Sequence, residues 1–482
     1  MEEQVICQGC IQKLIARVEK DSTTNNEKQI SSEDPYKLKL DHDDPEHPFM
    51  WNSKKKFFHL IIMLIMVFTM FLSLTFYVSH VLTKPELHTH LFLLTSMFSG
   101  FALGPFIGAP LSKHFGNRKI FLIFVFIFTI FHIFFIMISN KISLIIFRFL
   151  NGLFGGIIFS SCRLSIFDIF SNGGSFSKML LQSSVLLGIH MGPVVGLALE
   201  ENGRTVWWFW TSLILSAIIF VSSILILKEA SPEIILNKRI KRLRRVTGSS
   251  RFIACIEDKK PLRYVFLALL KMSWNILGKD FMLLFVIISK VIIWNTIFLI
   301  LFIHPFSLTK IYKGTLLNFF LLLLFHVLGI LLATICYKIY NELYIKRQKQ
   351  NKIKTKLLPS VIIYPLYISS LFWMGFTTHT LFHYIIPVLS HIVMGFSETL
   401  ILDSLNQYIE TSYSDDPYPV NINLAFSKLI ASTIIHAIIK KSLVQKITIL
   451  VTIIASINVF SYIISLVLFI LGSSLRSKIQ QN

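Results

Sequence analysis

The most constraining feature of this chain is a long apolar stretch that recurs along most of its length. A helix that crosses a bilayer needs roughly 20 predominantly apolar residues to span a hydrocarbon core of about 30 Å. About twelve stretches of that length can be placed in the sequence. They lie near residues 57–80, 91–111, 120–139, 143–162, 179–199, 206–227, 282–303, 316–338, 357–375, 380–402, 420–439 and 448–472. We therefore expect an integral membrane protein.

The composition and the pattern within the stretches narrow the fold class. With 54% hydrophobic and 15% charged residues over 482 positions, the chain cannot build a polar surface large enough to keep it in water. Backbone polar groups in lipid must be satisfied internally, and the stretches lack the alternation of a transmembrane barrel. The predicted fold is all-α. The first 56 residues show no apolar core before a cleavage site, so we expect no cleaved signal peptide.

Basic residues in the short loops predict the orientation. They gather before the first stretch, between the second and third, and between the eighth and ninth, which is one side of an even-numbered topology. These residues are Lys54, Lys55, Lys56, Lys113, Arg118, Lys119, Lys346, Arg347, Lys349, Lys352, Lys354 and Lys356. By the positive-inside rule that side is cytosolic, and both termini lie on it. Lys440, Lys441 and Lys446 fall on the opposite side and disagree with this assignment.

The same pattern divides the chain into segments. We predict a cytosolic tail at 1–56, a first helical bundle at 57–227, a basic cytosolic linker at 228–281, a second bundle at 282–472 and a tail at 473–482. The linker contains KRIKRLRR, which contributes to the formal net charge of +21. Such a run can bind nucleic acid, but we expect a helix that lies against anionic lipid and no nucleic-acid partner.

Cysteine spacing gives no complete metal site. Cys7 and Cys10 form one CxxC pair in the amino-terminal tail. A structural zinc site needs about four ligands, and no second CxxC or HxxxH lies nearby. We expect neither a metal ion nor another cofactor.

Four motifs carry a resemblance to a known family. They are DPEHPFMWNSKKK at 44–56, FALGPFIGAPLS at 101–112, GIHMGPVVG at 188–196 and EASPEIILNKRIKRLRRVTG at 229–248. Through them the chain resembles the fungal twelve-span drug:proton antiporter family of the major facilitator superfamily. The likeness extends from about Asp44 to the last stretch.

The resemblance implies a fold and a function. The fold would be two six-helix bundles related by a pseudo-twofold axis, with a cavity between them. The function would be proton-driven export of small amphipathic or cationic compounds, such as drugs and polyamines, by alternating access. It implies a transporter and not an enzyme, a monomer, and the plasma membrane, with the vacuolar membrane as an alternative. The residues that bind substrate are not assigned.

The turn between the second and third stretches departs from the family pattern. It contains Lys113, Gly116 and Arg118, and Lys113 stands where the family has an acid. A cation there would repel the basic partner that the acid normally pairs with. This departure motivates an alternative, a non-transporting sensor or scaffold on the same fold. A further alternative is uptake or facilitated diffusion, because one fold hosts many transport functions.

Four residues are candidates for proton coupling. Arg148 matches the family's arginine in the fourth stretch, and lipid exposure would cost it roughly 2.5–3.5 kcal/mol, so it should face the bundle interior. Asp168 follows the fourth stretch and Glu398 lies late in the tenth. His190 lies within GIHMGPVVG, and histidine titrates near neutrality. In the scheme that the resemblance implies, Arg148 modulates a nearby acid, and Asp168 or Glu398 takes the proton. The alternative for Glu398 is a structural role, as a water-exposed carboxylate near the cytosolic end of its helix.

GIHMGPVVG is also the predicted pivot motif, through Gly188, Gly192, Pro193 and Gly196. Proline bends a helix, and glycines at every fourth position make a smooth face. We expect that face to lie against the opposing half of the protein. A similar spacing at Gly100, Gly104 and Gly108 should let neighbouring helices approach closely.

Overall fold

The protein is described here as a computed structural model. The structure describes residues 37–38, 40, 43–76, 78, 87–137, 140–170, 174–200, 206–248, 253–254, 261–279, 281–312, 316–345, 352–412 and 447–481. Several predicted features lie outside these residues: the span at 420–439, the Cys7 and Cys10 pair, and the basic residues Lys346, Arg347, Lys349, Lys440, Lys441 and Lys446.

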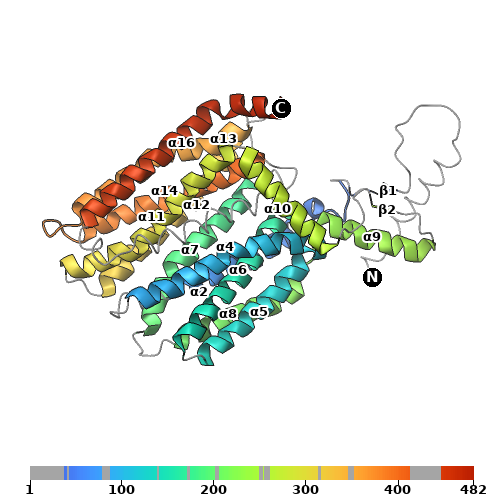
Figure 1. Ribbon diagram of the computed structural model, residues 1–482, viewed down its shortest axis with the longest axis horizontal. Helices are drawn as coiled ribbons and strands as arrows, with labels where there is room; N and C mark the ends of the chain where they lie inside the picture. Colours follow the sequence, from blue (N-terminus) through green and yellow to red (C-terminus); the bar gives the residue numbers. More distant parts are fainter. Residues whose placement is uncertain are drawn as a thin grey trace.

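Two sets of long helices make up the body of the molecule (Figure 1). The first set, drawn from blue to green, comprises α2 (Ser53–Thr75), α4 (Leu87–Phe115), α5 (Asn117–Met137), α6 (Lys141–Phe170), α7 (Ser175–Glu200) and α8 (Val206–Ile226). The second set, drawn from yellow to red, comprises α11 (Phe281–Tyr312), α12 (Leu316–Tyr340), α13 (Lys352–Thr377), α14 (Ile385–Ser412) and α16 (Ile447–Gln481). A short π-helical turn, η3 (Asn341–Ile345), follows α12. We call these sets the first half and the second half.

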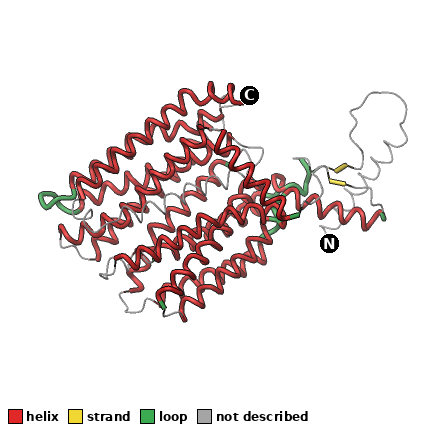
Figure 2. Tube along the Cα trace, viewed as in Figure 1, coloured by secondary structure: helices red, strands yellow, loops and turns green. Residues whose placement is uncertain are grey.

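The helices have the length and surface of membrane spans. Among the described residues, 10 helices are long and apolar enough to cross a bilayer, and the body is almost entirely helical (Figure 2). Large apolar side chains point outward from them, including Ile146 at 54% and Leu225 at 78% exposure. A bilayer would cover such side chains, which water would not solvate favourably. The prediction of an all-α membrane protein is confirmed.

Glycines bring α4 and α6 into close contact, as the spacing predicts. A Cβ added at Gly104 would lie 2.4 Å from the Cα of Gly156, and one at Gly100 would lie 2.0 Å from the carbonyl oxygen of Phe149. No larger residue fits there without separating the two backbones. The small residues therefore fix the spacing of this helix pair.

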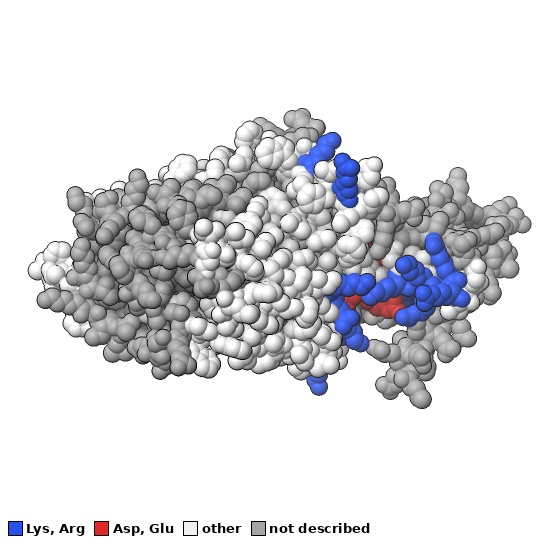
Figure 3. Space-filling model, turned by 60° about the horizontal axis from the view of Figure 1, so that its bottom comes forward, with Lys and Arg blue, Asp and Glu red and all other residues white. Residues whose placement is uncertain are grey.

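The predicted basic linker holds α9 (Pro232–Thr247) and α10 (Leu262–Lys279). A two-residue parallel ladder, β1 (Lys37–Leu38) with β2 (Ile253–Ala254), lies beside α9, and the short helix η1 (Pro48–Met50) contacts α6. We call the end of the body where α9 lies the α9 end (Figure 1). Lysines and arginines gather there, whereas the broad side of the body is largely uncharged (Figure 3).

The apolar side of α9 faces protein. Leu236, Ile240 and Leu243 are buried and pack with the chain near Leu38 and Leu40. The prediction that this helix lies against lipid is therefore wrong for its apolar side. An ion pair between Arg239 of α9 and Asp44 ties the helix to the segment before α2, and the remaining basic residues stay exposed.

Candidate functional site

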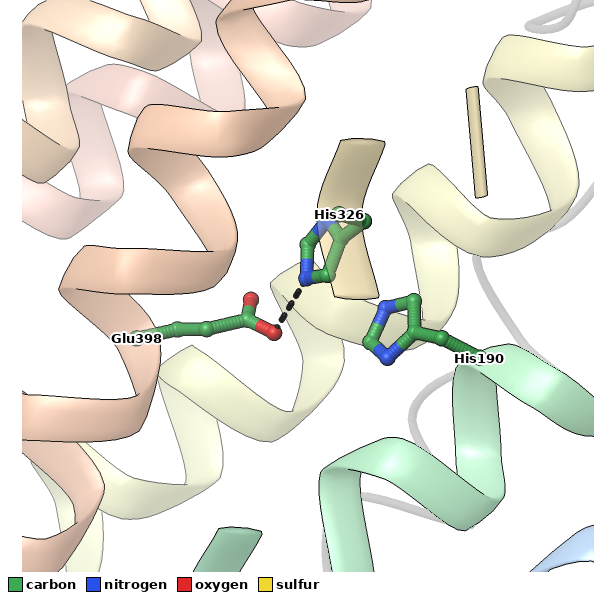
Figure 4. A group of neighbouring side chains, drawn as sticks. All are labelled: His190, His326 and Glu398. Carbon is green, nitrogen blue, oxygen red and sulfur yellow. Dashed lines mark hydrogen bonds and ion pairs between the residues drawn. The ribbon is translucent and has the colours of Figure 1, made fainter. Parts of the chain in front are cut away.

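Three ionisable side chains meet between the two halves. His190 comes from α7 of the first half, whereas His326 on α12 and Glu398 on α14 belong to the second (Figure 4). The His326 Nε2 lies 2.6 Å from the Glu398 Oε1. The His190 ring stacks on the His326 ring, with centroids 3.8 Å apart and planes 14° apart. We call His190, His326 and Glu398 the central cluster.

Glycines on α12 and α14 let the two helices approach closely enough for His326 and Glu398 to meet. A Cβ at Gly395 would lie 2.3 Å from the carbonyl oxygen of His326, and one at Gly329 would lie 2.2 Å from that of Ile392. Each glycine is three residues from the cluster member on its own helix, so the two share a face. The close backbone approach therefore places the carboxylate within hydrogen-bonding distance of the imidazole.

Hydrogen bonds orient both imidazole rings. The Nδ1 of His190 lies 2.9 Å from the Leu186 carbonyl oxygen. A carbonyl can only accept, so Nδ1 is the donor and Nε2 of the neutral ring keeps a lone pair. On the other side, the Nδ1 of His326 lies 3.3 Å from the Nδ1 of His391. In both rings, a contact of the Nδ1 atom with a group outside the central cluster therefore fixes the ring orientation.

Burial makes the central cluster chemically unusual. His190, His326 and Glu398 are 3%, 2% and 1% exposed. Within the described part of the chain, the hydrogen bond of Glu398 is the one to His326. A buried carboxylate held by a titratable partner, and not by a permanent cation, can exchange a proton. The alternative of a wet Glu398 at a helix end is wrong, because the residue lies near the middle of α14 and is buried.

A second set of polar contacts joins the halves near the α9 end. Glu410 of α14 accepts from Arg163 of α6 at 2.5 Å and lies 2.8 Å from the Nζ of Lys178 of α7. Amide contacts lie beside this ion pair: Asn406 donates to the Gln182 oxygen at 2.9 Å. Glu410 follows Glu398 by twelve residues, about 18 Å along the helix. The two sets are therefore separate contacts along one interface.

Lys356 of α13 extends the second set. Its Nζ donates to the Oε1 of Gln407 at 2.9 Å and also to the hydroxyl of Ser175, at the start of α7. The Nε2 of Gln407 donates to the carbonyl oxygen of Ser175 at 3.2 Å. We call the whole set the end lattice, comprising Arg163, Ser175, Lys178, Gln182, Lys356, Asn406, Gln407 and Glu410.

The interface is closed beside the end lattice. The cavity lined by Arg163, Asp403 and Glu410 has a volume of about 30 Å³. That is room for about two water molecules and not for an organic substrate. The described residues of the two halves are thus in close contact at the α9 end.

Arg148 faces the interior of the first half, as predicted. It is 2% exposed, and its guanidinium carbon lies 5.1 Å and 5.3 Å from the ring centroids of Phe135 and Phe209. Asp168 lies in the last turn of the same helix, twenty residues on and about 30 Å away. Asp168 is therefore not the acid near Arg148, and it lies within the helix and not after it as predicted.

The predicted gating turn is anchored by an acid from elsewhere. Lys113 lies in the last turn of α4, where a cation suits the helix dipole. Gly116 has φ of 98°, and a Cβ there would lie 2.5 Å from a Glu229 carboxylate oxygen. Glu229 accepts the backbone N–H of Asn117 at 3.0 Å. The missing acid at position 113 therefore does not leave the start of α5 without a carboxylate.

Two further contacts complete this turn. The side-chain amide of Asn117 donates to the Asp168 carboxylate at 2.8 Å. The guanidinium of Arg118 donates to the Ile224 carbonyl at 3.2 Å, near the end of α8. Asp168 and Arg118 thus belong to the α9-end surface of the first half and lie apart from the central cluster.

The glycines of the predicted pivot motif face their own half. A Cβ at Gly188 would lie 2.7 Å from the Phe68 carbonyl oxygen, and one at Gly192 would lie 2.0 Å from the Thr75 hydroxyl, both on α2. The prediction that this face meets the opposing half is wrong for these two positions. Pro193 and Gly196 are buried, and the Gly196 carbonyl accepts from the Trp208 indole at 2.9 Å. The motif packs α7 against α2 and α8, while His190 crosses to the other half.

Comparisons with known proteins agree with this architecture. The Major Facilitator Superfamily profile matches residues 57–416. The chain is 26% identical over 423 residues to Transporter mfs1 of Schizosaccharomyces pombe, covering 82% of this chain and 78% of that protein. It is 23% identical over 427 residues to Multidrug transporter FLR2 of Candida glabrata, covering 82% and 70%. It is 25% identical over 411 residues to Efflux pump radE of Floropilus chiversii, covering 82% and 74%.

A solved structure is similar in fold. It is the proton:xylose symporter XylE bound to 6-bromo-6-deoxy-D-glucose, with a TM-score of 0.63. The match covers 87% of this chain and 96% of that chain at 13% identity, and so concerns the fold alone.

Proposed function

Because the chain belongs to the Major Facilitator Superfamily, and is thus a membrane transporter and not an enzyme, we propose that it exports small amphipathic or cationic compounds in exchange for protons. Drugs and polyamines are compounds of this class. Two of the relatives are named as a multidrug transporter and an efflux pump, which supports export as the direction.

The observation that carries the proposal is the central cluster. Glu398 is a buried carboxylate between the halves, and its described partner, His326, is itself titratable. A proton held at this pair changes the charge of the interface at the level where a family member binds its substrate. Protonation can therefore favour one access state over the other, and this difference is what coupling requires.

Alternating access assigns a separate role to the end lattice. It joins the halves at the α9 end, where basic residues gather, and we propose on the positive-inside rule that this end faces the cytosol. We propose that the lattice opens when the transporter faces the cytosol and closes when it faces outward. The protein would act as a monomer in the plasma membrane, with both termini in the cytosol.

The proposal is tested with the purified full-length protein in lipid vesicles. An imposed pH gradient should drive a cationic dye or a polyamine against its concentration gradient, toward the acidic side. Collapse of the gradient with a proton ionophore should stop this movement. Transport of the same compound together with protons would indicate uptake. Equal transport with and without a gradient would contradict proton coupling.

A further inference from the structure

We propose that the central cluster binds one divalent transition-metal ion, of the class of Zn²⁺, Co²⁺ and Ni²⁺. One ligand atom from each of His190, His326 and Glu398 is available, and these atoms all lie within 4.8 Å of one another. Two imidazole nitrogens and one carboxylate oxygen suit these ions and leave a position for a water molecule. The sequence prediction of no metal site rested on cysteine spacing, which says nothing about residues from three different helices.

The distances require only side-chain adjustment. Ligand atoms on a tetrahedral Zn²⁺ lie about 3.3 Å apart, because each bond is about 2.0–2.2 Å long. The 2.6 Å separation of His326 and Glu398 would widen by several tenths of an ångström as the ion enters. The His190 ring, which stacks on the His326 ring, would also rotate about its side-chain torsions, because the lone pair of its Nε2 lies in the ring plane and must point at the ion. The three ligands lie on three different helices, so each side chain can adjust separately.

The hydrogen bonds outside the cluster match what metal-bound histidines need. A ligating imidazole usually gives its other N–H to a carbonyl or a similar partner, which fixes the ring and its tautomer. His190 donates from Nδ1 to the Leu186 carbonyl at 2.9 Å, so its Nε2 lone pair is directed away from that bond. The Nδ1 of His326 faces His391 at 3.3 Å, so its Nε2 is the atom that faces Glu398.

His132 is a buried histidine outside the central cluster, and its hydrogen bonds can be compared with those of His190. It has the same type of bond, from Nδ1 to the Phe128 carbonyl at 2.8 Å, and is also buried. Its Nε2, however, lies 3.1 Å from the Ser73 hydroxyl. It is a buried histidine with its second nitrogen engaged by a hydroxyl, and therefore a matched control for substitutions at the cluster.

Occupancy by a metal ion would connect the two halves. His190 belongs to the first half, and His326 and Glu398 belong to the second. An ion bound to all three resists their separation, so it should inhibit transport reversibly. This consequence rests on the proposed function, whereas binding itself does not.

The test measures binding to the purified full-length protein in detergent, without substrate. The protein carries no polyhistidine tag, and Cys7→Ser and Cys10→Ser remove the tail pair as a competing site. The protein is titrated with Co²⁺. Equilibrium dialysis should show one bound ion per chain, and the visible absorption of Co²⁺ should indicate a site with few ligands. Zn²⁺ should displace it and Mg²⁺ should not. His326→Gln and Glu398→Gln should each weaken binding by more than about tenfold, since loss of even an outer partner has that effect.

His132→Gln should bind Co²⁺ as the parent protein does. Absence of saturable binding to the parent, or equal binding by the parent, His326→Gln and Glu398→Gln, would overturn the proposal. A second measurement does not depend on the folding of those variants. Zn²⁺ should raise the thermal midpoint of the parent and of His132→Gln. No rise in the parent would also overturn the proposal, even if the vesicles show proton-driven export.

Discussion

The central cluster and the end lattice both join the same two halves, but they use different kinds of charge. The cluster consists of two histidines and one glutamate, side chains that can each be either neutral or charged. The lattice instead pairs the Glu410 carboxylate with a guanidinium and an ammonium group, those of Arg163 and Lys178. We therefore expect a change in proton concentration to act first on the central cluster. This division suits a transporter in which one contact senses the driving ion and the other closes the path.

The largest expected effect is at Glu398. Glu398→Gln keeps the size of the side chain and a possible hydrogen bond to His326, but removes its titration. In vesicles, transport driven by an imposed pH gradient should be lost, while exchange of substrate between equal pools should persist. His132→Gln is the control and should retain both activities. Undiminished gradient-driven transport by Glu398→Gln would remove this residue from the coupling mechanism.

Loss of the permanent charge at Glu410 should open the α9 end. Glu410→Gln leaves the partly buried Arg163 and Lys178 without their carboxylate, at a cost below the roughly 3–5 kcal/mol of breaking a fully buried pair. The thiol of Leu181→Cys, which lines the adjoining cavity, should then react faster with a water-soluble reagent. Glu342→Gln, a change at an exposed acid of the same half, should leave the rate unchanged. Equal labelling in both variants would show that the lattice does not close this end.

The next effect is at Gly395, which supports the central cluster. Gly395→Ala would place a Cβ 2.3 Å from the His326 carbonyl oxygen, so α12 and α14 must separate. Overpacking of this kind costs about 1–3 kcal/mol, and the thermal midpoint and the transport rate should both fall. Gly278→Ala on α10, where nothing lies within 4 Å, should change neither. A stable and fully active Gly395→Ala protein would argue against this helix contact.

The smallest effect is expected at Lys113. Lys113→Asp restores the family's acid in the turn, but it places a negative charge at the carboxyl end of α4, at a cost of about 0.3–1 kcal/mol. Glu229 already binds the start of α5, so transport should not improve. Lys119→Asp, at the amino end of α5, should not destabilise the protein. A faster transporter with Asp at 113 would show that the missing acid limits activity.

The fold was predictable because its causes are local in sequence. Apolar stretches of about twenty residues and the small residues at Gly100, Gly104 and Gly108 depend on neighbours along one helix. The spacing predicts a close contact with a neighbouring helix, and the structure shows that this helix is α6.

The candidate site was only partly predictable, since it combines three helices. Glu398 and His190 were identified because ionisable groups are rare within spans. Their meeting through His326 was not predicted, because nothing in the spacing pairs α7 with α12 and α14. The contact of Glu229 with the start of α5 was not predicted for the same reason. The helix that Gly192 faces, α2, depends on how α7 is rotated about its own axis, which the sequence does not show. The clearest available signal was the occurrence of several histidines in apolar stretches.

The most direct test of the central claim is proton release on substrate binding. Purified protein in a weakly buffered detergent solution is mixed with a transported cation, and the pH change is recorded with a dye. If Glu398 holds the exchanged proton, the unmodified protein and Glu410→Gln should both release protons when they bind substrate, and Glu398→Gln should bind without release. Equal proton release by Glu398→Gln, at matched substrate occupancy, would contradict the assignment of the central cluster as the coupling site.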